Sequence, residues 1–502
     1  MKSNRTLAVL LLTAMLLPAC GAANSSEATA TSSANVENVT EATTTALSIA
    51  SVVPENVDLG GREIKFFAEQ GNTGTVTMRE DSIYQEEDTG DIVYSAIYNR
   101  NMKVEDYLNN KIVVSMTCKP QDGIKTLSNS VAAGSDDFDV FAGYQCYSIS
   151  ASALGYMMPM DKVANLDLTA PYWAADYISD ISYKGTYWAV GDIDLCFIGG
   201  FYSTMVNTRL WNSIRKDTNI YDVVRDGKWT FDYLRAACED IWQDVNGDGT
   251  TSFGDILGAQ YTLADMFAAG MNARFSERDK DGTPYLTVNS EHILDVWSKM
   301  YQFLFETKGV TGTGAQAENA ADVLFCEGTM LTYTHMLSST MTYLREMEDD
   351  YYMLPVPMMD EKQGEYTSRV HDSATLYGLP VTAKKTDEIG VTLEAMEIES
   401  HLTVMPAYYD EALKYKYTRD ADSAEMIDLI RDNAKTDFAY IYSESIGGGL
   451  GTTGKGIHRI FRTGYTGKLE SLSSHIASNI DAYNKNFADL LACYDKLAKE
   501  QK

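Results

Sequence analysis

Residues 138–145 read FDVFAGYQ, a short apolar run that ends at a glycine, a tyrosine and a glutamine. The length and composition of the run predict a buried strand over 138–142. Two similar runs precede it, and segments with helical periodicity separate the three. Alternating strands and helices are typical of a parallel sheet in an α/β domain. The earlier strands are expected at 63–67 and 111–116, and the helices at 91–109 and 122–134.

Tyr144 and Gln145 directly follow this third strand. In open parallel sheets, ligands bind beyond the carboxyl ends of the strands. An aromatic ring and an amide at this position make Tyr144 and Gln145 candidate ligand contacts. The alternative is a loop tip that exposes an aromatic side chain.

The rest of the chain continues the α/β pattern and contains no internal repeat. A strand is expected at 331–333, and residues 351–357 are expected to be extended up to their prolines. Apolar periodicity predicts six further helices. Their expected limits are 203–214, 230–243, 290–307, 385–403, 420–434 and 467–499.

The first twenty residues have the pattern of a bacterial export signal. A positive start precedes an apolar run over 7–17, which is too short to span a bilayer. The run ends in LPAC at 17–20, which resembles a lipobox, in which the cysteine is acylated and becomes the new N-terminus. A plain secretory peptide cut near Ala19 is the alternative, and it also exports the chain.

We therefore expect a lipoprotein that is anchored to the cell membrane and faces outside. The expected parts are a signal peptide over 1–19 and a lipidated Cys20 that begins a disordered tether over 20–58. The tether is rich in Ala, Ser, Thr and Glu and has few large apolar residues. A diacylated cysteine carries two acyl chains, which suffice for stable anchoring.

The composition of the chain excludes some classes of partner and favours others. The net charge is −30, which argues against a nucleic-acid partner because phosphates require basic patches. So acidic a surface keeps an exported protein soluble, and we expect a monomer. Tyrosine is twice as frequent as phenylalanine, at 32 against 16, and rings with a polar group suit carbohydrate stacking. The six cysteines after Cys20 form no CxxC pair, so neither a zinc site nor a disulfide framework is indicated.

Five short motifs follow one another along the chain: DVFAG at 139–143, SYKGTYWAV at 182–190, GKWTF at 227–231, FxxGxM at 325–330 and LPxP at 354–357. Together they resemble the extracellular solute-binding proteins of ABC importers. The match is to the type 1, mostly sugar-binding group, which shares its architecture with maltose-binding protein. The segment 393–416 is similar to a long variant common in Firmicutes. The resemblance covers residues 59–450 and rests on the order of the motifs.

The resemblance implies a two-lobe α/β fold, the type II clamshell of periplasmic binding proteins, with hinge strands and extra C-terminal helices. Ligand binds between the lobes, and hinge closure buries it. The implied function is not enzymatic: the protein captures an extracellular sugar or oligosaccharide and delivers it to the permease subunits of an ABC transporter. Lobe 1 is expected over 59–190 plus 375–410, and lobe 2 over 191–374 plus 411–502. The chain is expected to cross between them near 189–202 and 369–377.

A sugar site combines aromatic rings with planar polar groups, and the resemblance places such residues near the crossings and the strand ends. Each candidate has a structural alternative: a carboxylate that caps a turn, a hydrogen-bonding histidine, or an aromatic residue of the core. The candidates beyond Tyr144 and Gln145 are Trp173, Asp192, Asp194, Tyr333, His335, His371, Asp372 and Tyr408.

Residues 244–255 (DVNGDGTTSFGD) fit the calcium-loop pattern D-x-N-x-D-G-x5-[DE]. Gly249 permits the sharp turn, and a helix is expected to lead into the loop. The last position is Asp rather than the usual Glu, and nearby glycines argue against an exit helix. A bound Ca²⁺ would be structural, and the alternative is an Asx-rich turn without an ion. The expected ligands are Asp244, Asn246, Asp248, Thr250, Ser252 and Asp255.

Two other function classes remain open. An anchored extracellular glycoside hydrolase would need two carboxylates facing each other across a cleft, and no local arrangement of Asp and Glu singles out such a pair. The sequence contains no GxSxG, no HExxH and no glycine loop ending in GK[ST]. A carbohydrate-adhesion protein would suit the calcium loop but not the strand–helix alternation with crossing segments.

Overall fold

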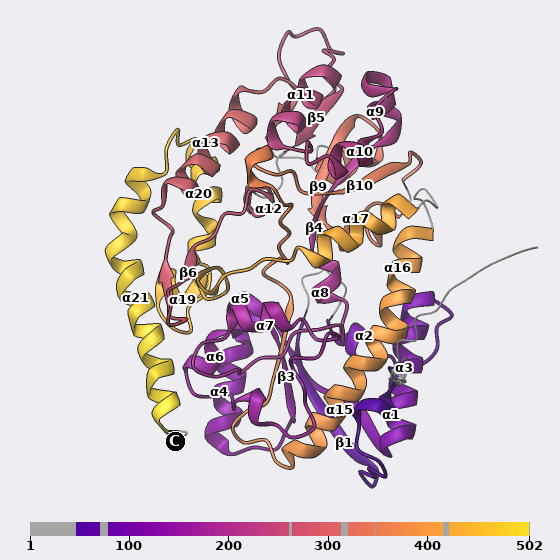
Figure 1. Cartoon of the computed structure of the whole chain (residues 1–502), viewed down its shortest axis with the longest axis vertical. Helices are drawn as coiled ribbons and strands as arrows, with labels where there is room; N and C mark the ends of the chain where they lie inside the picture. The colour runs from indigo at the N-terminus through magenta and orange to yellow at the C-terminus, as the bar shows by residue number, and fades with distance from the viewer. Residues whose placement is uncertain are drawn as a thin grey trace, which may run out of the picture. The chain divides into compact units, whose positions relative to one another are not determined.

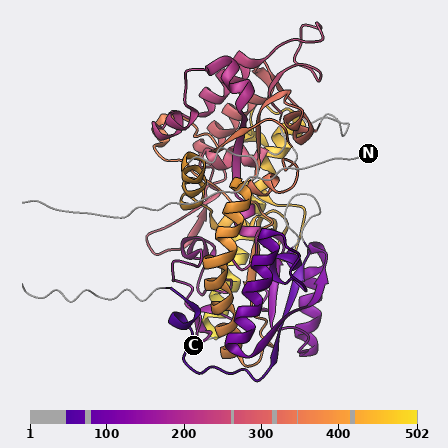
Figure 2. The same cartoon turned by 90° about the vertical axis from the view of Figure 1, so that its right-hand side faces the viewer.

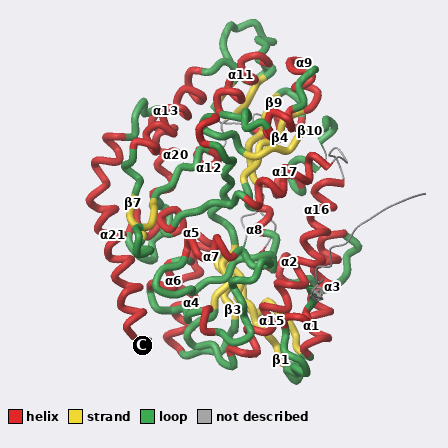
Figure 3. The backbone as a smooth tube through the Cα atoms, in the orientation of Figure 1, coloured by secondary structure: helices red, strands yellow, loops and turns green. Residues whose placement is uncertain are grey.

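The computed structural model describes residues 47–70, 79–260, 264–312, 320–345, 347–414 and 421–500. The predicted leader, Cys20 and the first part of the predicted tether lie outside the described residues. Residues 46–502 form one compact unit. Within it, two separate sheets are each covered by helices (Figures 1 and 3).

The first sheet has the strand order β11-β3-β1-β2. β1 (Arg62–Glu69) pairs in parallel with β2 (Asn110–Cys118) and β3 (Val140–Tyr144), so the three predicted strands form the predicted parallel sheet. β11 (Thr375–Gly378), from much later in the chain, pairs antiparallel with β3. The start of β11 therefore meets the carboxyl end of β3.

The helices that connect these strands begin and end where local chemistry favours it. The Asp91 carboxylate caps α3 (Ile92–Leu108) by accepting the backbone N–H groups of Val93 and Tyr94. α4 (Gly123–Ala133) ends at Gly134, whose φ of 61° suits a glycine. This sheet and the helices around it are called the first lobe below. Besides α3 and α4, its helices are α1 (Ile49–Val52), α2 (Arg79–Ile83), α5 (Gln145–Ser148), α6 (Ser150–Ala153), α7 (Ala175–Ile181) and α15 (Thr386–Glu399).

The second sheet has the order β10-β4-β9-β5-β8. β4 (Tyr202–Asn207) pairs antiparallel with both β10 (Tyr351–Pro355) and β9 (Met330–Met336), and β9 pairs in parallel with β5 (Leu257–Gln260), which is joined by β8 (Val310–Thr311). The expected helix over 203–214 was wrong in its first half. Residues 203–207 are a central strand, buried along its whole length and hydrogen-bonded on both sides. Asn207 then caps the helix that follows.

Helices cover the second sheet and, with it, make up the second lobe. A short hairpin, β6 (Ser276–Arg278) with β7 (Pro284–Leu286), extends from it. The helices are α9 (Thr208–Arg215), α10 (Ile220–Arg225), α11 (Phe231–Ile241), α12 (Ala264–Gly270), α13 (Glu291–Glu306), α14 (Ala321–Cys326) and α17 (Ala421–Asp432).

The chain passes between the lobes at two extended segments. The first runs from Ala189, which bridges to Tyr377 in the first lobe, through α8 (Cys196–Gly199) to β4. The second runs from Val370, which bridges to Phe201, to the start of β11. The second passage is short, so the residues between Val370 and β11 lie where the two lobes meet.

A third connection is helical. α15 continues through a π-helical turn (Ser400–Val404) into α16 (Met405–Lys414), and both pack along α3 (Figure 2). Pro406 lies directly after the π-helical turn and supplies no N–H to that turn, which accounts for the local change in the helix. α17 then packs against β10 in the second lobe.

The C-terminal region holds more helices than the single one expected over 467–499. α18 (Phe438–Ile441), α19 (Ser443–Gly448) and α20 (Ile460–Gly467) precede the long α21 (Ser473–Glu500). The residue limits expected for the two lobes stay predictions.

Candidate functional site

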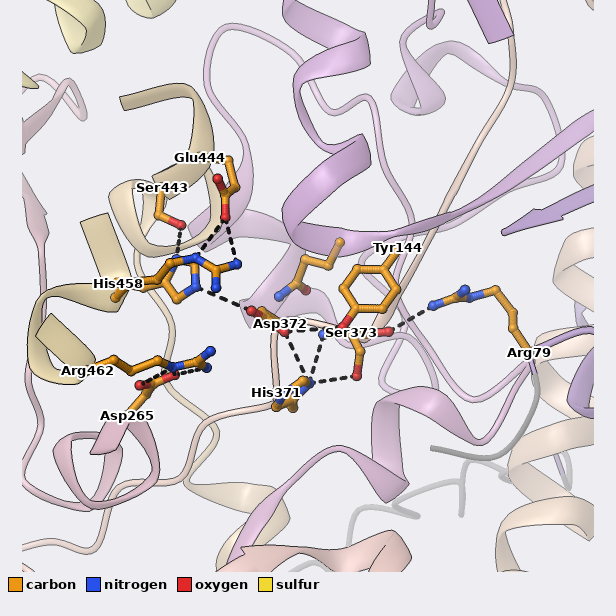
Figure 4. A network of polar contacts seen from close by, with 12 residues as sticks. Arg79, Tyr144, Asp265, His371, Asp372, Ser373, Ser443, Glu444, His458 and Arg462 are labelled. Atoms are coloured by element: carbon orange, nitrogen blue, oxygen red, sulfur yellow. Dashed lines mark hydrogen bonds and ion pairs between the residues drawn. The ribbon is translucent and has the colours of Figure 1, made fainter. Parts of the chain in front are cut away.

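A buried carboxylate, Asp372, lies in the second passage between the lobes and is contacted from three directions (Figure 4). The Tyr144 hydroxyl, at the end of β3, donates to Asp372 Oδ1 over 3.4 Å. His371 Nδ1 lies 3.2 Å from Asp372 Oδ1, and His458 Nε2 lies 3.4 Å from Oδ2. Burial favours the neutral acid, but the two histidines outweigh burial and hold the pKa of Asp372 well below its usual value.

Charged pairs from the C-terminal helices surround this carboxylate. Arg462 of α20 donates from Nε to Asp265 Oδ1 of α12 over 3.0 Å. Arg459 donates from Nη2 to Glu444 Oε1 of α19 over 3.1 Å. Both pairs are partly shielded from water. The network therefore joins the first lobe, the passage, the second lobe and the C-terminal helices.

A buried arginine supports the first-lobe side of the network. Arg79 of α2 donates from Nε to Thr375 Oγ1 over 2.7 Å and from Nη2 to the Ser373 carbonyl over 2.8 Å. Its guanidinium carbon lies 5.6 Å from the centre of the Tyr144 ring. Arg79 thus fixes both the end of the passage and the tyrosine that contacts Asp372.

Glu69 completes this side at the carboxyl end of β1. It accepts the Tyr144 backbone N–H over 2.5 Å and the Ser148 hydroxyl over 2.7 Å. Burial raises the pKa of Glu69 to about 7, although Ser148, Tyr144 and Arg79 each lower it. A carboxyl group with this pKa changes its charge near neutral pH.

Gln145 is fully buried at the start of α5. Its Oε1 accepts the Tyr177 hydroxyl over 2.7 Å, while its Nε2 has no hydrogen-bond partner among the described residues. The candidates Tyr144, Gln145, His371 and Asp372, from distant parts of the sequence, thus come together at the meeting point of the lobes. As ligand contacts they stay predictions.

Trp173 and Asp192 lie in a second place, a cavity of about 580 Å³ beside the first passage. Arg431 of α17 lies 3.3 Å from Asp192 Oδ2, and His401 of the π-helical turn lies 3.8 Å from the same atom. The Trp173 indole N–H donates to Glu394 over 3.0 Å, which orients the ring. A cavity of this size with aromatic and charged walls falls in the range of small-molecule sites.

The remaining candidates have structural partners. Asp194 accepts the Tyr377 hydroxyl over 2.6 Å and the Cys196 N–H over 2.7 Å. Tyr333 stacks on His335 with ring centres 5.2 Å apart, and His335 Nδ1 lies 2.6 Å from Ser339 Oγ. Tyr408 is buried in the core, in α16.

His335 and His371 are close enough to interact electrostatically. Burial, with a smaller contribution from His371, lowers the pKa of His335 to about 3. His335 therefore stays neutral at physiological pH.

The expected calcium loop is an exposed turn that leads into β5 without an exit helix. Asp244 accepts the N–H groups of Gly247 (2.6 Å) and Gly249 (2.9 Å), and Asp255 accepts that of Ser252 (3.0 Å). In the described part of the chain, no group of three or more His, Cys, Asp or Glu side chains is arranged to hold a metal ion. Occupancy by Ca²⁺ stays a prediction.

Sequence reasoning missed Arg79, Asp265, His458 and Arg462. Their segments carry no motif, and only the folded chain brings them to Asp372. The one available signal was the rarity of histidine, of which the chain has 6. Three of those six, at 335, 371 and 458, gather here.

Comparison with solved structures identifies the fold. An ABC substrate-binding protein from Listeria monocytogenes, in complex with cycloalternan, matches with a TM-score of 0.54 and 13% identity over 85% of this chain and 99% of that chain. This chain has the fold of ABC-transporter solute-binding proteins. The expected α/β clamshell class with extra C-terminal helices is confirmed.

Two further structures with this fold show the same likeness. The galacto-N-biose/lacto-N-biose I-binding protein of Bifidobacterium longum, in complex with lacto-N-biose, matches with a TM-score of 0.54 and 12% identity over 87% of this chain and 98% of that chain. A solute-binding protein of Thermotoga lettingae, bound with α-D-tagatose, matches with a TM-score of 0.53 and 12% identity over 85% and 100%. No protein-family model and no curated protein matches the sequence. Among the described residues, no helix is long and apolar enough to cross a membrane.

Proposed function

We propose that this protein is a solute-binding lipoprotein that captures an extracellular sugar or oligosaccharide and delivers it to the permease of an ABC transporter. The fold supports the class of protein, and the complexes with cycloalternan, lacto-N-biose and tagatose supply a precedent for carbohydrate on this fold. The leader pattern around Cys20 supports a lipid anchor on the outer face of the membrane. We propose no enzymatic activity.

The single observation that carries the proposal is the polar network around Asp372. It lies at the carboxyl edge of the first sheet, where ligands bind in open α/β folds. Its members come from both lobes and from the passage between them, so a solute bound there would be held by parts that hinge motion moves relative to one another. A carboxylate, imidazoles and a phenol suit sugar hydroxyls, which both donate and accept hydrogen bonds.

A titration of residues 46–502, which form a compact unit, against a panel of mono- and oligosaccharides tests the proposal. We expect saturable binding by calorimetry and no new product by chromatography. Turnover of a sugar would show that the protein is a glycoside hydrolase and not a binding protein. If no sugar in the panel binds, the proposal that the solute is a carbohydrate is wrong.

Two matched substitutions locate the solute. Asp372→Asn removes the charge at the network, and Asp192→Asn removes the equivalent charge in the cavity beside Trp173. Because a hydrogen bond to a charged group contributes about 1.5–3 kcal/mol, we expect Asp372→Asn to weaken binding by roughly tenfold or more, and Asp192→Asn to leave the affinity unchanged. If Asp192→Asn weakens binding and Asp372→Asn does not, the solute binds in the cavity beside Trp173 instead.

We also propose that the loop 244–255 binds a structural Ca²⁺. The sequence pattern supports this proposal, together with the position of Gly249, whose φ of +77° permits the turn. The carboxylates of Asp244, Asp248 and Asp255 all lie on this one turn, where their oxygens accept N–H groups of the loop.

A further inference from the structure

The long C-terminal helix α21 contacts both lobes. It contains 28 residues, Ser473 to Glu500, and therefore spans about 42 Å. Figure 1 shows it as the yellow helix that runs from beside α13 and α20 down to the level of α4 and α6. A helix of this length is stiff compared with the short extended passage from Val370 to β11.

The first turns of α21 are held by the second lobe. The Trp297 indole N–H of α13 donates to the carbonyl of Leu469, just before the helix, over 2.8 Å. Ile476 and Ile480 line a small hollow together with Leu294 of α13. α13 in turn packs on the second lobe through Phe303, whose ring centre lies 4.9 Å from that of Phe231 in α11.

The last turns of α21 are held by the first lobe. The Tyr494 hydroxyl lies 2.7 Å from Ser152 Oγ of α6, and Ser152 Oγ also accepts the Trp188 indole N–H over 3.0 Å. The Tyr494 ring centre is 5.6 Å from that of Tyr187. Tyr494 also hydrogen-bonds to Tyr442, and it is almost fully buried. Tyr494 is therefore the polar anchor of this end.

We propose that α21 is a strut that sets the spacing of the two lobes, and that the end held by Tyr494 must release before the lobes rotate. A helix fastened at both ends cannot follow a hinge rotation without bending or detaching at one end. At the second-lobe end the hydrogen bond from Trp297 goes to Leu469, which precedes the helix, and the helix itself lines the hollow there with Ile476 and Ile480. At the first-lobe end a side chain of the helix, Tyr494, makes the directional hydrogen bonds itself. The hinge rotation itself rests on the proposed function, but the anchoring of α21 does not.

A second tie joins the same lobes. Arg278 of the β6–β7 hairpin donates from Nη2 to the carbonyls of Asp180 (2.8 Å) and Ser182 (2.7 Å) in the first lobe. Removal of the Tyr494 anchor alone is therefore expected to loosen α21 locally without opening the whole molecule. Removal of both ties is expected to leave the chain passages and the network around Asp372 as the remaining connections between the lobes.

Hydrogen–deuterium exchange of the ligand-free protein tests the strut directly. Tyr494→Phe removes the hydroxyl and keeps the ring, and Ser152→Ala removes the same hydrogen bond from the other side. We expect either variant to speed exchange over residues 489–500 by roughly tenfold, with little change over 473–482. Tyr483→Phe is the matched control, because Tyr483 lies on the same helix and its hydroxyl makes no hydrogen bond within the described part of the chain. Equal exchange in Tyr494→Phe and the wild type would overturn the proposal.

Solution scattering tests the consequence for the lobes. With a sugar that binds the wild type, we expect Tyr494→Phe combined with Arg278→Ala to compact more than the wild type and to bind several-fold more tightly. Unchanged affinity and unchanged compaction would overturn the role of α21 in closure. If no sugar binds, the proposed function fails, while the exchange experiment still decides whether Tyr494 anchors the helix.

Discussion

At the scale of single residues, Glu69 shows how burial couples the first lobe to pH. Its ordinary pKa of 4.5 is raised to about 7 by burial. Between these values the folded protein binds more protons at this site than the unfolded chain does. The free energy of unfolding contributed by Glu69 is therefore highest below pH 4.5, falls as the pH rises to about 7, and is constant above it.

Glu69→Gln should remove this dependence, because the amide is neutral at every pH and can still accept the Tyr144 N–H. We expect the variant to be more stable than the wild type at pH 8, by on the order of 1–3 kcal/mol, and closer to it at pH 5. Urea unfolding at the two pH values measures the difference. Glu63→Gln, at an exposed position of the same strand, is the control. Parallel pH profiles for wild type and Glu69→Gln would contradict the prediction.

At the scale of elements, the start of α3 depends on one carboxylate. Asp91 Oδ1 accepts the N–H groups of Val93 and Tyr94 over 3.0 and 3.1 Å. Asp91→Ala leaves both donors without this partner, so we expect the free energy of unfolding to fall by about 1 kcal/mol. Asp106→Ala, at an exposed position of the same helix, should have little effect. Denaturant unfolding of both variants checks the prediction, and equal midpoints would refute it.

The loop 244–255 offers a second test at this scale. If it binds Ca²⁺, adding the ion at 100 times its Kd should stabilise the protein by about 2.7 kcal/mol, and EDTA should reverse the effect. Asp248→Asn should abolish the calcium response. Asp281→Asn, in the exposed turn of the β6–β7 hairpin, should keep it. If neither calcium nor EDTA changes the midpoint of thermal unfolding, the loop is an Asx-rich turn that binds no ion.

The three parallel strands of the first lobe and its helices α3, α4 and α15 could be predicted because local signals agree there. The apolar runs of β1, β2 and β3 are short and well bounded, and Gly134 marks the end of α4. β4 was mistaken for helix because its residues are buried on both faces and so lack the alternation that identifies a strand. The three short helices α18, α19 and α20 were missed, and the helix expected over 467–499 begins later, at Ser473.

At the scale of the whole molecule, the anchor is the first prediction. Cys20→Ser removes the acylation site, so we expect the protein to leave the membrane fraction and enter the soluble extracellular fraction. Immunoblots of fractionated cells that produce wild type or variant measure this. Cys118→Ser, at a half-buried cysteine of β2, should stay with the membrane. Equal membrane retention of Cys20→Ser would contradict the lipobox assignment.

The candidate site shows the limit of sequence reasoning at this scale. Tyr144 could be placed at a sheet edge from its own segment, whereas the crossing that contains His371 and Asp372 was implied by the family resemblance. That they meet is a property of β11 pairing with β3, which joins distant parts of the chain. Arg79, His458 and Arg462 reach the network around Asp372 through the tertiary packing of α2 and the C-terminal helices. No local sequence pattern predicts this packing.

The buried cysteines have a practical consequence for how the protein is made. Burial raises the pKa of the thiols of Cys146, Cys196 and Cys238, which keeps these thiols protonated and unreactive. Folding around these three residues therefore requires neither an oxidant nor a disulfide isomerase. A leaderless chain should therefore reach its native state in the reducing interior of a laboratory host, and no step of oxidative refolding needs to be designed.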